Sequence, residues 1–128
     1  VRKISTPVYW LGPVSGSKYT LENQAGQRIF VRYLPDGKIP PAGEASKRIV
    51  GTYKLANAFA STEAAGTSIA GGIGFTNNDG AAVYYNKTSP NNVYVAFPNV
   101  NAQIEIFDPV KGIAVQLAST KDALQVIR

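Results

Sequence analysis

The chain has 128 residues with 45% hydrophobic and 16% charged residues and a net charge of +5, a size and composition typical of one globular domain with its own core. It contains no Cys and no His, which excludes disulfides, thiolate zinc sites and the nucleophile–base pairs that use those residues. Asn, Gln, Ser and Thr outnumber the charged residues, which favours an exported protein.

The N-terminal part of the chain predicts a lead-in, a strand and a hairpin. Residues 1–6 are polar, and we expect them to be the end of a tether in front of a single globular domain over residues 7–128. Val8–Leu11 is aromatic and β-branched, which favours a buried strand. Two apolar runs, 19–22 and 29–33, flank a turn that contains glycine and predict a β-hairpin.

The middle of the chain predicts a loop, a strand and a short helix. Residues 35–47 are rich in proline and glycine without periodicity, which is typical of a surface loop. Residues 49–55 read as a strand. An Ala-rich helix is expected over 57–66, with Asn57 as its N-cap and Gly66 as its C-terminal stop.

Residues 68–107 predict further strands. Residues 68–75 form a strand weakened by three glycines, which suggests a bulge or a close backbone approach, and a turn follows at 77–80. The segments 82–85 and 93–97 alternate cleanly and predict a second hairpin, and 103–107 alternates again.

The hydrophobic period changes at Asp108 and Pro109, an N-cap followed by proline at the first helical position. Apolar residues at helical spacing favour an amphipathic helix over 109–118, although alternation in the same segment leaves a strand as the alternative. A last strand is expected at 124–127. The whole pattern predicts an α+β fold, mainly an antiparallel sheet of seven to nine short strands with two short helices.

Strand alternation divides the predicted sheet into two faces. We expect a core face formed by Ile29, Val31, Tyr33, Val83, Tyr85, Val93, Val95, Phe97, Ile104 and Ile106. The opposite face would carry Phe30, Tyr84, Tyr94 and Phe107 beside Arg28, Arg32 and Glu105. A helix, loop or second sheet is expected to cover this second face, and an aromatic binding surface is the alternative.

No motif in the sequence predicts catalysis, a metal site or a cofactor. Ser15 and Lys18 have the SxxK spacing but fall in a Gly/Ser loop instead of a helix. Residues 71–74 are glycine-rich but lack the endings of phosphate-binding loops. The eight carboxylates are scattered among turns, caps and strand faces. We therefore predict no catalytic residue, no metal site and no cofactor.

The positive charge raises the question of an anionic partner, because each neutralised phosphate releases counterions. The basic residues are scattered, however, and only Arg2-Lys3 and Lys47-Arg48 are adjacent. Solubilising charge is thus favoured over binding of nucleic acid or another anionic polymer, which we keep as an alternative function.

Several short segments resemble uncharacterised exported or lipoprotein-type domains of actinobacteria and related bacteria. These segments are PVYWLGP at 7–13, FVRYLP at 30–35, VGTY at 50–53, ANAF at 56–59 and IFDP at 106–109. The resemblance implies an extracytoplasmic, membrane-tethered or surface domain. It implies no activity and no functional residue.

The sequence therefore predicts a non-enzymatic extracytoplasmic module, binding or structural, at a bacterial cell surface. Its partner would be a protein or a glycan, and it would meet the membrane only through a tether outside this chain. The expected binding residues are Trp10, Arg32, Tyr84 and Tyr94, because exposed aromatic residues beside arginine make adhesive surfaces. Self-association through strand edges into a filament or surface layer is the alternative.

Overall fold

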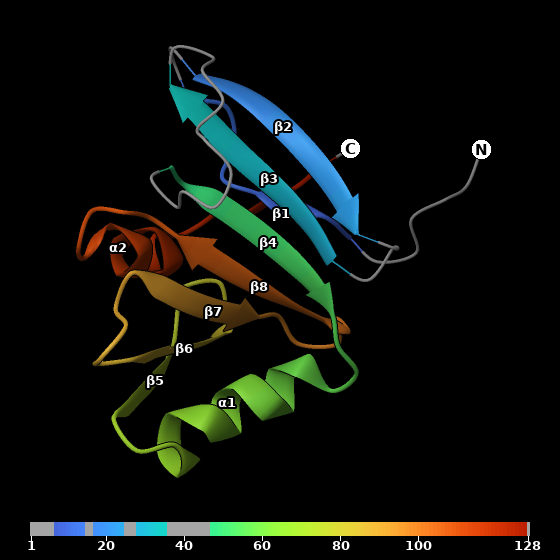
Figure 1. The fold of residues 1–128 in the computed structure, drawn as a ribbon. Helices are drawn as coiled ribbons and strands as arrows, with labels where there is room; N and C mark the ends of the chain where they lie inside the picture. The colour runs from blue at the N-terminus through green and yellow to red at the C-terminus, as the bar shows by residue number, and fades with distance from the viewer. Residues whose placement is uncertain (1–6, 15–16, 25–27, 36–46, 128) are drawn as a thin grey trace.

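The computed structural model describes residues 7–14, 17–24, 28–35 and 47–127, and it is built around a seven-stranded antiparallel sheet (Figure 1). The strand order is β2-β3-β4-β8-β7-β6-β5, and a separate two-stranded sheet pairs β1 with β9. The strands are β1 (Tyr9–Trp10), β2 (Ser17–Gln24), β3 (Arg28–Pro35), β4 (Ile49–Lys54), β5 (Gly72–Thr76), β6 (Ala82–Asn86), β7 (Asn92–Ala96), β8 (Ala102–Phe107) and β9 (Gln125–Val126). The helices are α1 (Ala58–Ser68) and α2 (Ile113–Ser119). The predicted α+β class is confirmed.

Both predicted hairpins are present within the one sheet. The first joins β2 to β3 and the second joins β6 to β7, each with the antiparallel register that alternation requires. The predicted lead-in at 1–6, the hairpin turn at 25–27 and most of the predicted loop, 36–46, lie outside the described residues.

The core lies on one face of the sheet. Ile104, Ile106, Val93 and Val95 are fully buried there, and β1, β9 and α2 pack over them. Ten residues were predicted to face this core: eight are buried, and the other two, Tyr85 and Phe97, are half-buried against it. The alternation of apolar residues thus identified the core face.

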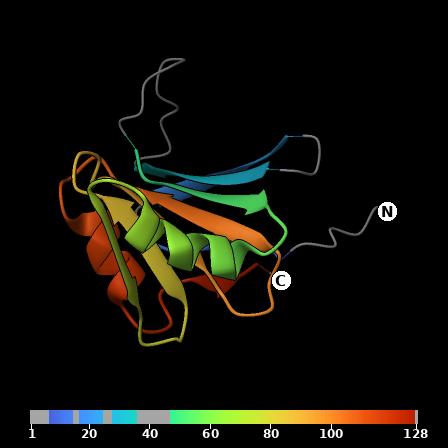
Figure 2. The same ribbon diagram turned by 90° about the horizontal axis from the view of Figure 1, so that it is seen from below.

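Helix α1 packs on the opposite face, at the end of the sheet that carries β5 and β6 (Figure 1, Figure 2). Its buried residues Ala58 and Thr62 lie one turn apart, so they share the stripe that contacts the sheet. The Gln103 side-chain amide donates a 2.9 Å hydrogen bond to the Thr62 hydroxyl. Neither α1 nor α2 has the length and apolar character that a bilayer crossing demands.

Asn57 occupies the predicted N-cap position of α1, but the capping chemistry that was expected at the two helix ends is absent. Asn57 adopts a left-handed conformation (φ 56°), and its side chain makes no capping hydrogen bond. Gly66 does not stop the helix, which continues to Ser68, so the following strand begins at Gly72 instead of residue 68. Gly66 serves tertiary packing instead, because a Cβ built there would lie 2.7 Å from the Cα of Gly74 on β5.

Helix α2 begins four residues later than the predicted start at Pro109. The Asp108 carboxylate, instead of capping a helix, accepts a 2.9 Å hydrogen bond from the Val110 N–H and pairs at 2.8 Å with Arg48. This local turn leads to Gly112, which adopts a left-handed conformation (φ 88°) directly before the first helical residue, Ile113. The favoured prediction of a helix in this segment is confirmed, and Ala114 and Ala118 are buried on one side of α2.

Candidate functional site

The sheet face opposite the core brings five residues into one row across five neighbouring strands. Phe30, Gly51, Glu105, Tyr94 and Tyr84 are successive register partners on β3, β4, β8, β7 and β6. Strand neighbours lie about 4.8 Å apart, so the side chains of Glu105, Tyr94 and Tyr84 lie next to one another, while Gly51 leaves a gap beside Phe30. We call this surface the open face: Phe30, Arg32, Gly51, Tyr53, Tyr84, Asn92, Tyr94, Gln103, Glu105 and Phe107.

The predicted cover over this face is present at one end only. Helix α1 lies on the β5 and β6 end, whereas two cavities are hollowed along the rest of the open face. The sequence patterns gave no position for the helix, so the cover and the binding surface were treated as alternatives. In the structure the helix covers one end of the face and forms one wall of the larger cavity, while Tyr84 and Tyr94 beside it stay partly exposed.

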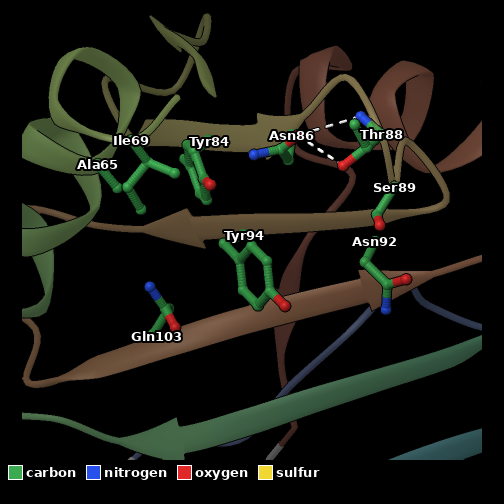
Figure 3. Close-up of a pocket in the computed structure, with 9 residues that line it drawn as sticks. All are labelled: Ala65, Ile69, Tyr84, Asn86, Thr88, Ser89, Asn92, Tyr94 and Gln103. Carbon is green, nitrogen blue, oxygen red and sulfur yellow. Dashed lines mark hydrogen bonds between the residues drawn. The ribbon is translucent and has the colours of Figure 1, made fainter. Parts of the chain in front are cut away.

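The larger cavity has a volume of about 720 Å³ and lies between α1 and the turn that joins β6 to β7 (Figure 3). Figure 3 shows Tyr84 and Tyr94 in the middle, with Ala65 and Ile69 of the helical wall to one side. The remaining lining side chains, grouped toward the turn and along β8, are amides and hydroxyls: Asn86, Thr88, Ser89, Asn92 and Gln103. Every side chain that lines this cavity is uncharged.

The two tyrosines face each other across the β6–β7 pair. Tyr84 and Tyr94 are register partners, and their ring centroids lie 6.0 Å apart with an interplanar angle of 23°. Both are half-buried, so each ring is held in place while part of its surface stays accessible. Two nearly parallel rings thus offer an apolar surface in the middle of a polar rim.

Hydrogen bonds fix both walls of the larger cavity. On one side, Gln103 binds Thr62 of α1. On the other, the Asn86 amide donates to the Ala70 carbonyl at 3.0 Å and its oxygen accepts from the Thr88 hydroxyl at 2.8 Å. The polar groups around the tyrosines are therefore oriented before any ligand arrives, which lowers the entropic cost of binding.

The second cavity, of about 330 Å³, lies over β3, β4 and β8. It is lined by Phe30, Arg32, Ile49, Gly51, Asn92, Glu105 and Phe107. Asn92 lines both cavities. The two cavities are therefore adjacent, with the Asn92 side chain between them.

Glu105 lies in the middle of the open face and is surrounded by hydrogen-bond donors. Its Oε1 accepts the Tyr53 hydroxyl at 2.6 Å, and its Oε2 accepts the Asn92 amide at 2.6 Å and the Tyr94 hydroxyl at 3.5 Å. Burial, followed by the hydrogen bond and charge of Glu105, raises the pKa of Tyr53, and burial and the Glu105 charge raise the pKa of Tyr94. Both hydroxyls thus keep their protons and act as donors to the carboxylate.

A glycine gives the aromatic side chains their arrangement beside Glu105. A Cβ at Gly51 would lie 2.9 Å from the Tyr53 ring and 3.0 Å from the Phe30 ring. Without it, those rings meet edge to face with centroids 5.8 Å apart. The Arg32 guanidinium lies 5.5 Å from the Phe30 ring centroid and forms an ion pair with Glu22.

Three of the four predicted binding residues lie on this face. Tyr84 and Tyr94 are adjacent in the larger cavity, and Arg32 lines the smaller one. Trp10 lies elsewhere: it packs half-buried against the core layer, with its ring edge-on to Tyr19 at 5.3 Å. The structure therefore does not bring Trp10 to the other three.

The central carboxylate and the amides of the site were missed as binding residues. Alternation had already placed Glu105 on the same face as Tyr94, and that was the available signal for its role. Asn92 and Gln103 carried no comparable signal, because an isolated amide in a strand is common.

Comparison of the chain with protein-family models, with curated proteins and with solved structures gives no match. Within the described ranges, no three Asp or Glu residues gather closely enough to hold a metal ion. The candidate site is thus defined by its own geometry: a neutral, tyrosine-centred cavity next to a smaller cavity that contains a single carboxylate.

Proposed function

We propose that this protein is a binding module that recognises a glycan in the larger cavity of the open face and does not transform it chemically. The observation that carries the proposal is the lining of that cavity. Two tyrosine rings, Tyr84 and Tyr94, are surrounded by five uncharged amide and hydroxyl side chains.

This lining matches the chemistry of a sugar ring. The C–H groups of a pyranose form an apolar surface that packs on an aromatic ring, while its hydroxyls both donate and accept hydrogen bonds. Asn86, Asn92 and Gln103 can likewise donate and accept. The cavity volume of about 720 Å³ falls in the range of pockets that enclose small ligands.

The same lining disfavours an anionic polymer as the ligand of this cavity. Binding of phosphate or sulfate groups depends on Lys and Arg, and neither lines the larger cavity. The net charge of +5 is thus better explained as solubilising charge.

The arrangement of the carboxylates supports binding without catalysis. Glycoside hydrolysis needs two carboxyl groups about 5 to 10 Å apart. On the open face, Glu22 and Glu105 belong to the same register row but are separated by β3 and β4, which puts their backbones about 14 Å apart. Glu22 is in addition paired with Arg32.

We also propose that the module works outside the cytoplasm, at a bacterial cell surface. The support is its low charged content without cysteine and its resemblance to exported domains. Fractionation of a producing bacterium with an antibody against the domain tests this placement, and recovery only in the cytosolic fraction would refute it.

Glycan binding is tested by screening the purified domain on an oligosaccharide array and titrating the hits by calorimetry. Tyr84→Ala should weaken binding about tenfold, because it removes the contact area of one ring, while Tyr84→Phe should retain most of the affinity. Phe75→Ala is the matched control. Phe75 is an exposed aromatic residue on edge strand β5, and its register partner Val83 lies on the core face and not on the open face.

A second variant guards against loss of the fold in Tyr84→Ala. Ser89 is exposed in the β6–β7 turn, so Ser89→Trp should fill the cavity without disturbing the core. It is expected to abolish binding at an unchanged melting temperature. Full binding by Ser89→Trp, or no oligosaccharide bound by the wild type, would reject the proposal.

A further inference from the structure

We propose that the smaller cavity beside Glu105 binds a protonated amino group of the ligand, so that the glycan contains at least one amino sugar that is not acetylated. This inference rests on the proposed function and specifies the class of sugar. It is argued from the direction of the hydrogen bonds, the charges and the rings around Glu105.

The first argument is the direction of the hydrogen bonds. Tyr53 and Tyr94 both donate their hydroxyl hydrogens to the Glu105 carboxylate. Neither hydroxyl hydrogen is then left to donate to a ligand, and the Glu105 carboxylate, which lines the smaller cavity, presents its remaining lone pairs there. Asn92 uses its amide nitrogen on Glu105, which leaves its oxygen as a further acceptor. This cluster of acceptors fits a ligand group that carries several donors, and an ammonium has three.

The second argument is charge. In the described part of the chain, the two ion pairs neutralise Glu22 with Arg32 and Asp108 with Arg48. Glu105 forms no ion pair there, and its partners are two hydroxyls and an amide. Arg28 lies further along β3, opposite Tyr53 in register, and is exposed. A ligand ammonium beside Glu105 would therefore complete an ion pair that the chain leaves incomplete.

The third argument is the aromatic lining. Phe30 and Phe107 line the same cavity as Glu105. Ring faces attract cations, and Phe30 already does so with Arg32 at 5.5 Å. Arg32 lines this cavity too and is paired with Glu22, so Phe107 is the ring that an ammonium beside Glu105 would contact. A volume of about 330 Å³ leaves room for an amino group together with the sugar ring that carries it. Because Asn92 lines both cavities, a sugar held by Tyr84 and Tyr94 can direct its amine toward Glu105.

The test compares two ligands that differ only by acetylation. Glucosamine oligomers and N-acetylglucosamine oligomers of equal length are titrated against the full domain by calorimetry at neutral pH. The wild type should bind the amine form at least about tenfold more tightly, the value of one charge-assisted hydrogen bond. Glu105→Gln should bind both forms equally, with the affinity that the wild type shows for the acetylated form.

The control variant is Glu63→Gln, which removes an exposed carboxylate from α1 and should leave the preference unchanged. Equal binding of the two forms by the wild type would overturn the amine inference but not the glycan proposal. Binding of neither form, together with an empty oligosaccharide array, would overturn both.

A third ligand, a short lysine oligomer, tests whether the site recognises an amine on a sugar or an amine on any chain. Binding of this peptide as tightly as the glucosamine oligomer, with the same dependence on Glu105, would overturn the inference by assigning the cavity to a basic peptide. The ligand comparison in the wild type needs no substitution, so the result stands even if Glu105→Gln fails to fold.

Discussion

Gly66 of α1 and Gly74 of β5 approach each other so closely that neither position has room for a side chain. A Cβ on Gly66 would lie 2.7 Å from the Cα of Gly74, and a Cβ on Gly74 would lie 2.8 Å from the Cα of Gly66. Backbone cannot yield as a flexible side chain can. This contact sets how near the helix lies to the sheet, and with it the width of the larger cavity.

Gly66→Ala should therefore destabilise the fold by about 1 to 3 kcal/mol, the cost of overpacking, although alanine is the better helix former. Ala64→Gly is the matched control, since Ala64 is exposed in the same helix, and it should cost about 1 kcal/mol through propensity alone. Urea denaturation monitored by circular dichroism measures both. A more stable Gly66→Ala variant would show that the helix is free to move away from β5.

The buried ion pair between Asp108 and Arg48 gives a second prediction. The Asp108 side chain is only 6% exposed and lies 2.8 Å from Arg48, so Arg48→Ala would leave a buried charge unpaired and cost about 3 kcal/mol. Asp108→Asn removes the charge of the ion pair but keeps an acceptor for the Val110 N–H, so it measures the ion pair separately from the hydrogen bond of the turn. Glu63→Ala, at an exposed position, should stay within about 0.5 kcal/mol. Near-wild-type stability of Arg48→Ala would contradict this account.

Alkaline pH should destabilise the protein through Tyr33. Burial is the main cause that raises the pKa of Tyr33 from 10 to about 12, and its hydroxyl accepts from the Leu11 N–H and donates to the Gly12 carbonyl. Between these two values the unfolded chain loses the proton while the folded chain keeps it, so stability falls as the pH rises. The loss approaches about 2 to 3 kcal/mol by pH 12.

Denaturant unfolding at a series of pH values from 8 to 11 measures this loss. Tyr33→Phe should be less stable at pH 8, because two buried backbone groups lose their partner, but its stability should fall less steeply above pH 10. Burial also raises the pKa of Tyr9, Tyr53 and Tyr94, so part of the slope should remain. An unchanged slope in the variant would contradict the role of Tyr33.

The hydrogen bond between Gln103 and Thr62 predicts how firmly α1 is held. Thr62→Val removes the hydroxyl at nearly constant shape and leaves the half-buried Gln103 amide with one partner fewer, which should cost about 1 kcal/mol. Amide hydrogen exchange in α1 should accelerate relative to β8. Thr67→Val is the control, because Thr67 is exposed and its hydroxyl binds only within the helix. Equal acceleration in both variants would assign the effect to helix propensity.

Alternation made the sheet predictable. The polarity of successive residues separated Val93 and Val95 from Tyr94, and the structure places them on the core face and the open face as expected. Period two is a local property of a strand, so no knowledge of strand order is required. Strand order itself depends on contacts between distant segments and could not be read from the chain.

The C-terminal end of α1 and the N-terminal end of α2 were not predictable, because the residues with capping chemistry there had other roles. Gly66 has the chemistry of a helix stop but serves a close approach to β5. Asp108 has the chemistry of an N-cap, but its carboxylate binds Arg48, sixty residues away. The candidate site was not predictable because it also depends on contacts between distant segments. Glu105 stands out only when its neighbours on β4 and β7 are known to be Tyr53, Asn92 and Tyr94.

The pairing of β1 with β9 brings Tyr9 opposite Val126, on the layer that packs behind the sheet. Both ends of the described chain thus leave the molecule from its back, with the sheet between them and the cavities. A domain immobilised through either end, on a biosensor surface or as a fusion to a carrier, would still offer Tyr84 and Glu105 to the surrounding solution.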